Sequence, residues 1–127
     1  MKGRFWRDGS VLTVYCTLIF LLSHQPTLPM PLAFPHQDKL SHLVAYAVMA
    51  ILAWRAFSHR LSATQALWLA TALFCSLYGM SDEFHQSFIP GRNSEVADWL
   101  ADTLGAVIAA AGMARYRQRR SAAVAEV

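Results

Sequence analysis

The sequence predicts an all-α integral membrane bundle of four transmembrane helices, with both termini in the cytoplasm. Hydrophobic residues make up 55% of the 127 residues, and they gather in four stretches, at residues 11–23, 40–57, 66–80 and 96–114. Polar segments separate these stretches, and the sign of their charge alternates from one segment to the next. Because the stretches are apolar nearly all round, lipid is the environment expected to bury them.

Basic residues gather on one side of this alternation. Nine of the eleven Lys and Arg residues fall there, and only Lys39 and Arg92 fall on the other side. The positive-inside rule assigns the basic side to the cytoplasm, which predicts a multi-pass protein of the inner (cytoplasmic) membrane. Nine bases and two acids give the inner side a net charge of +7, and two bases and six acids give the outer end −4. The outer acids are Asp38, Asp82, Glu83, Glu95, Asp98 and Asp102.

The first apolar stretch, residues 11–23, is short of the roughly 20 residues that a span needs. Extending it over residues 8–24 makes a thin span feasible. Arg4 and Arg7 precede it, so a signal peptide is the alternative interpretation. We favour an uncleaved anchor because no convincing small-x-small cleavage site follows. Residues 25–35 carry four of the five prolines and predict an extended loop on the outer side.

The second and third helices are expected to form an antiparallel pair. Asp38 is well placed to cap the N-terminus of the second helix. The short basic segment 57–63 predicts a tight turn on the inner side. The third helix should end near Gly79 or continue as an interfacial helix through Gln86.

The fourth helix follows a turn at Pro90 and Gly91, with Asn93 or Ser94 as its N-cap. Small residues recur along it at spacings of three and four. Such a stripe lets a neighbouring helix approach closely. The members of the stripe are Ala101, Gly105, Ala109 and Gly112.

The whole chain, residues 1–127, is predicted to be a single domain. Cys16 and Cys75 lie inside apolar spans, lack metal-site spacing and are expected to pack as small apolar residues. The basic residues flank apolar spans, which indicates membrane lipids as partners and argues against nucleic acid.

Polar residues at the outer ends of the second, third and fourth helices form a candidate site. Asp102 should lie roughly 10 Å or more below the start of its helix, by helix rise. An ionisable group at that depth costs about 2.5–3.5 kcal/mol on insertion scales, so it should face the bundle interior, and a functional role is the default interpretation. The candidate residues are Asp38, Lys39, His42, Asp82, Glu83, Gln86, Arg92, Asp98 and Asp102.

Two motifs frame this site. The first is Asp38-Lys39-Leu40-Ser41-His42 with Tyr46 downstream, and the second joins Gly79, Asp82-Glu83-Phe84-His85-Gln86, Pro90-Gly91-Arg92, Asp98 and a closing Gly105. In order and spacing they resemble the motifs of the VanZ-like membrane proteins, over about residues 35–112. The resemblance implies a cell-envelope protein associated with antibiotic resistance, here to the glycopeptide teicoplanin, but it implies no reaction. One position departs from the family, because Asp102 stands where Asn is usual.

Two functions remain open at this level, beside a purely structural interpretation in which the polar network only orients three helices. The site could bind an envelope lipid, the headgroup of a lipid-linked envelope precursor, or an ion. Alternatively, the protein could be a metal-dependent membrane enzyme acting on a lipid-linked phosphate or another envelope substrate. A divalent cation would then be needed, since six acids repel a phosphate. Its candidate ligands are Asp82, Glu83, His85 and Asp98, with His42 as a further choice. Carboxylates favour Mg²⁺, Mn²⁺ or Ca²⁺, and histidine would bring in Zn²⁺.

Overall fold

The computed structural model describes residues 2–26 and 34–125. They form four helices, α1 (Lys2–Ser23), α2 (Gln37–Phe57), α3 (Thr64–Gln86) and α4 (Val96–Ala125), and the described residues contain no strand. The all-α prediction is confirmed. By length and composition, α1, α2 and α4 are long and apolar enough to cross a membrane. Helix α3 is long enough, but the mean hydropathy of its most apolar segment is lower than theirs.

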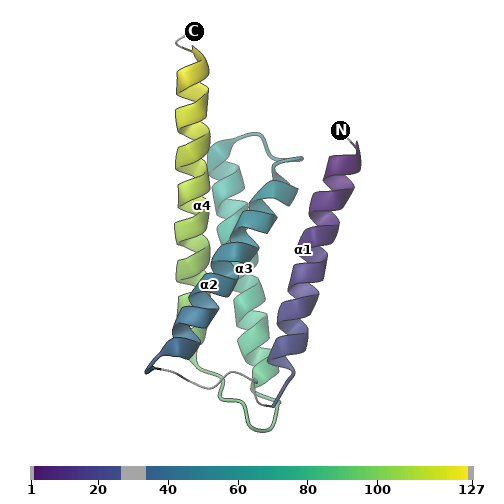
Figure 1. Cartoon of the computed structure of the whole chain (residues 1–127), viewed down its shortest axis with the longest axis vertical. Coiled ribbons are helices and arrows are strands. Elements are labelled where there is room, and N and C mark those ends of the chain that lie inside the picture. The colour runs from purple at the N-terminus through teal and green to yellow at the C-terminus, as the bar shows by residue number, and fades with distance from the viewer. Residues whose placement is uncertain (1, 27–33, 126–127) are drawn as a thin grey trace.

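The helices form a bundle (Figure 1), and the residues at its two ends differ in charge. The start of α1, the end of α4 and the α2–α3 connection lie together at what we call the terminal end. The start of α2, the end of α3 and the start of α4 lie at the opposite end, which we call the polar end. In the described residues, α1 packs on α2 and α3 and does not reach α4. The fold therefore has a three-helix core with α1 along one edge (Figure 1).

Close contact between α2 and α4 sets the core. A Cβ atom at Gly105 would collide with the backbone carbonyl of Leu43, so only glycine permits this approach. Small residues continue the contact beyond Gly105, since Ala50, Ala53 and Ala106 are fully buried. The predicted stripe of small residues is thus used at Gly105. It is not used at Gly112, where an added Cβ would meet nothing within 4 Å.

Tyrosines attach α1 to this core. The Tyr15 hydroxyl donates a hydrogen bond of 2.9 Å to the carbonyl of Ala45 on α2. From α3, the Tyr78 hydroxyl donates one of 2.6 Å to the carbonyl of Cys16. Both bonds end on backbone carbonyls, so they fix the position of α1 along α2 and α3 whatever side chain the acceptor residue carries.

Two predicted N-caps are displaced by one or two residues. Helix α2 begins at Gln37, and Asp38 lies in its first turn instead of capping it. Helix α4 begins at Val96, beyond the predicted caps Asn93 and Ser94. The carbonyl of Glu95 accepts the first helical hydrogen bond, so the chain turns into the helix later than the side-chain pattern suggests.

The other boundaries agree better with the sequence. Helix α3 runs unbroken through Gln86, as one of the two alternatives expected, and α1 is longer than the predicted stretch 11–23 because it already begins at Lys2. The predicted proline loop, residues 25–35, falls mostly at 27–33, outside the described residues.

Substitution of Gly105 tests the helix contact. Gly105→Ala should lower the thermal stability of the detergent-purified protein by about 1–3 kcal/mol, because the new methyl group must push α4 away from the α2 backbone. Gly112→Ala is the matched control, since its methyl group points into open space and alanine favours the helix by up to about 1 kcal/mol. Equal melting temperatures for the two variants would contradict the contact.

Candidate functional site

Lys39 links α2 to α4 at the polar end. Its Nζ lies 2.8 Å from Asp98 Oδ1, 2.8 Å from Glu95 Oε2 and 3.1 Å from Asp38 Oδ2. Asp98 is buried, with 5% of its surface exposed, whereas Asp38 and Glu95 are exposed. Lys39 is therefore the counter-ion of a buried carboxylate, with two further acids at its outer edge.

His42 forms the next layer down. Its Nδ1 lies 2.9 Å from Oδ1 of Asp102, a side chain with no exposed surface. With Asp102 ionised, Nδ1 is the donor, which leaves Nε2 as the nitrogen free to bind a ligand. The second Asp102 oxygen, Oδ2, has no hydrogen-bond partner. It faces Gly79 of α3, where an added Cβ would come within 2.8 Å of it, so the glycine makes room for the carboxylate.

Glu83 of α3 completes this group. Its Oε2 accepts a hydrogen bond of 3.0 Å from the backbone N–H of Glu95, and its Oε1 is buried without a partner. One ligand atom each from His42, Glu83 and Asp98 lies within 4.8 Å of the others. Three different helices thus bring an imidazole and two carboxylates together, a donor set that suits a divalent cation.

A second group lies on the α1 side of α3. Asp82 Oδ2 accepts hydrogen bonds from Ser23 Oγ at 2.8 Å and from Gln86 Nε2 at 3.2 Å. Arg92 reaches this group through its Nε and one terminal nitrogen, which donate to Gln86 Oε1 at 3.3 and 2.9 Å. Arg92 therefore approaches the acids through an amide. Ser23 was not predicted to belong to the site. The only sequence signal for it is its position at the end of the first apolar stretch, at the same end of the bundle as Asp82.

The four metal ligands proposed from the sequence do not converge in the structure. Asp82 is occupied by Ser23 and Gln86, and His85 pairs with His24 at 3.2 Å and stacks on it. Successive residues of a helix point about 100° apart, so adjacent polar residues on α3 serve different neighbours. Glu83 and Asp98 do meet, and within the described chain His42 takes the position expected for His85.

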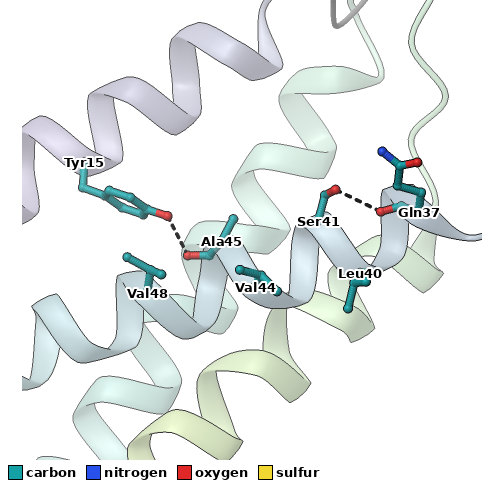
Figure 2. Close-up of a pocket in the computed structure, with 7 residues that line it drawn as sticks. All are labelled: Tyr15, Gln37, Leu40, Ser41, Val44, Ala45 and Val48. Carbon is teal, nitrogen blue, oxygen red and sulfur yellow. Dashed lines mark hydrogen bonds between the residues drawn. The ribbon is translucent and has the colours of Figure 1, made fainter. Parts of the chain in front are cut away.

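An apolar groove of about 410 Å³ runs between α1 and α2 but does not belong to this site. It is lined mainly by Leu40, Val44 and Val48, with Tyr15 across from them on α1 (Figure 2). Lys39 and His42 leave the opposite side of α2, toward α4. The two faces of α2 are therefore distinct, one apolar and one charged.

Comparisons with known proteins agree with this architecture. The sequence model described as VanZ/LLP1 matches residues 10–116, a span that includes residues of all four helices. An uncharacterized protein of Schizosaccharomyces pombe (strain 972) is 30% identical over 115 residues, which are 87% of this chain and 66% of that protein. The chain thus spans slightly less than two thirds of that relative's length. No solved structure matches. The extent of the family match shows that the chain belongs to the VanZ/LLP1 family.

Proposed function

We propose that this chain is a multi-pass protein of the inner (cytoplasmic) membrane, with all four helices spanning and the terminal end in the cytoplasm. Three span-capable helices support the membrane location. The proposed orientation rests on charge, because the terminal end holds nine of the eleven Lys and Arg residues. The start of α1, the end of α4 and the α2–α3 connection share that end (Figure 1), as an even number of crossings requires.

We further propose that the polar end binds a divalent cation and, through it, the phosphate-bearing headgroup of an envelope lipid or lipid-linked precursor. One observation carries the cation: the Glu83 carboxylate lies beside His42 and Asp98, and one of its oxygens, Oε1, is buried without a partner. A buried carboxylate oxygen normally has a partner, and a cation would supply one. The Asp102–His42 contact has the form of the carboxylate–histidine pair that orients metal-binding imidazoles.

The charge of the site supports a phosphate-bearing headgroup bound through the cation. Its acids outnumber its bases, so an anion would be repelled unless a cation stood between them. Arg92 is linked to Asp82 through the Gln86 amide, and its planar guanidinium can grip a phosphate at two points. Lys39 adds a second positive charge at the outer edge of the site. The association with teicoplanin and antibiotic resistance belongs to this proposal as an expectation from the family resemblance.

A metal-dependent enzyme acting on a lipid-linked phosphate is the second candidate. The oriented imidazole favours it, since His42 Nε2 could bind the cation or accept a proton from an attacking water. Binding and catalysis share the same residues here, so a test of the cation comes first.

Cysteine labelling tests the topology, including whether α3 crosses the membrane. In a background with Cys16 and Cys75 replaced by alanine, Asn93→Cys should react with an impermeant maleimide on intact cells, and Ser58→Cys only after lysis. Both positions are exposed, and they flank α3. Labelling of both residues from the same side would overturn the crossing of α3.

Metal titration of the detergent-purified protein tests the cation site. Calorimetry with Mn²⁺, Zn²⁺ and Mg²⁺ should detect binding of at least one ion, and His42→Ala or Glu83→Gln should weaken it at least tenfold because each removes one ligand. His85→Ala is the matched control, because His85 contacts His24 outside the site. No binding by the unaltered protein, or equal losses in His42→Ala and His85→Ala, would reject the site.

Substitutions of Asp102 test whether this residue only orients His42 or is needed as a carboxylate. Asp102→Asn should keep cation affinity within about tenfold, because the amide oxygen can accept the same hydrogen bond from His42 Nδ1. Asp102→Leu, which keeps the branched shape but can accept no hydrogen bond, should weaken binding about 10–100-fold through loss of that orientation. If Asp102→Asn is as damaging as Asp102→Leu while both variants express normally, the carboxylate itself is required and the proton-transfer interpretation gains.

A further inference from the structure

A second charged cluster lies at the terminal end, far along the bundle from the proposed cation site. At its centre is Asp8 of α1, a buried acid with 9% of its surface exposed. Its Oδ2 lies 2.9 Å from His59 Nε2, and its Oδ1 accepts hydrogen bonds from Arg55 at 3.1 Å and Arg7 at 3.2 Å. One carboxylate thus gathers two guanidinium groups from different helices.

The two arginines keep most of their binding capacity. Arg7 and Arg55 side chains are 60% and 51% exposed, so much of each guanidinium fork is open to a further ligand. Arg60 adds to the same surface, with its guanidinium carbon 4.9 Å from the centre of the Phe5 ring. Asp8 neutralises one of these three arginines. The cluster therefore carries an excess of positive charge that the fold does not compensate.

A pocket opens beside this cluster, between α1 and α2. Its volume is about 100 Å³, room for roughly three water molecules and hence for a compact group such as a phosphate. Arg7, Asp8 and Arg55 form its charged part, and Val11 and Leu52 form its apolar part. Val11 lies on the bundle surface with 46% of its area exposed. The pocket thus joins a cationic rim to an apolar surface on a helix able to span a membrane.

We infer that this pocket binds the phosphate group of an anionic phospholipid, with Arg7 and Arg55 gripping the phosphate and an acyl chain lying against Val11 and Leu52. Guanidinium forks bind phosphate oxygens at two points, and Asp8 holds both forks in place. The apolar half selects a lipid over a soluble anion, because a free phosphate gains nothing from it. This inference needs the protein to lie in a membrane but is independent of the cation site.

Such a lipid would also strengthen the edge of the fold. Among the residues that the structure describes, helix α1 packs only against α2 and α3, and less extensively than α4 packs on its neighbours. A phosphate shared by Arg7 of α1 and Arg55 of α2 would join these two helices where Asp8 already begins to do so. Bound anionic lipid should therefore stabilise the folded protein by mass action.

Native mass spectrometry and thermal unfolding of the full chain test the proposal, with phosphatidylglycerol and phosphatidylcholine of identical acyl chains as probes. The unaltered protein should retain phosphatidylglycerol about 10–30-fold better, the ratio expected from two arginines near a membrane surface, and should melt at a higher temperature in its presence. The double variant Arg7→Gln/Arg55→Gln should lose both effects. The matched control is Arg119→Gln/Arg120→Gln, which removes the same charge from exposed positions on α4 outside the pocket.

The remaining outcomes separate this site from simpler explanations. Arg7→Lys/Arg55→Lys keeps the charge but not the fork and should retain clearly less phosphatidylglycerol than the unaltered protein. Equal retention of both lipids by the unaltered protein would overturn the proposal even if the glutamine variant failed to fold. Equal losses in the α4 control would reduce the effect to general electrostatics and also reject it. Stabilisation by millimolar inorganic phosphate equal to that by lipid would assign the pocket to a soluble anion instead.

Discussion

The contact between Gly105 and the backbone of Leu43 is the constraint on which the polar end depends. It draws α2 and α4 together so closely that short side chains can span the gap. Three contacts between the two helices follow one another with rising residue number on both: Lys39 with Asp98, His42 with Asp102, and Leu43 with Gly105. The order of these pairs shows that α2 and α4 run in the same direction. An aspartate reaches only a few ångströms from its backbone, so wider helix spacing would leave these acids without their partners.

Burial of these acids has a consequence for the rest of the site. A charge that leaves water is tolerated only with a counter-ion and hydrogen bonds. Lys39 meets this need for Asp98, and His42 meets half of it for Asp102. Two oxygens are left over, Glu83 Oε1 and Asp102 Oδ2. Both belong to residues with one oxygen firmly held, so the unpaired atoms have fixed positions. A fixed, unpaired and buried oxygen suits a cation better than it suits a purely structural role.

The sequence predicts those features that depend on composition along one helix. The all-α class, the gathering of acids at one end and the close approach at Gly105 follow from hydropathy, charge and residue size. Features that depend on helix rotation were missed. The run from Asp82 to Gln86 looks like one acidic motif, yet Asp82 turns to α1 and Glu83 to α4. His85 likewise turns away from Glu83 and contacts His24. Of the two histidines expected as ligands, only His42 therefore lies beside Glu83 and Asp98.

The burial of Asp8 was missed for a different reason. Asp8 is one of few acids among the many bases of the inner side, so its sequence position gave no sign of a special role. Only the structure shows that it pairs with arginines of two helices. The two ends of the bundle differ in the sign of their charge and in which charges are buried. At the polar end a single lysine holds acids in place, and at the terminal end a single aspartate holds arginines in place. At the terminal end the central Asp8 is buried and the arginines around it are exposed, whereas at the polar end Lys39 is more exposed than its partner Asp98. The terminal end therefore presents guanidinium groups at its surface, whereas the polar end keeps most of its acids buried. This difference fits the two ligands proposed, an anion held at one surface and a cation held inside the other end.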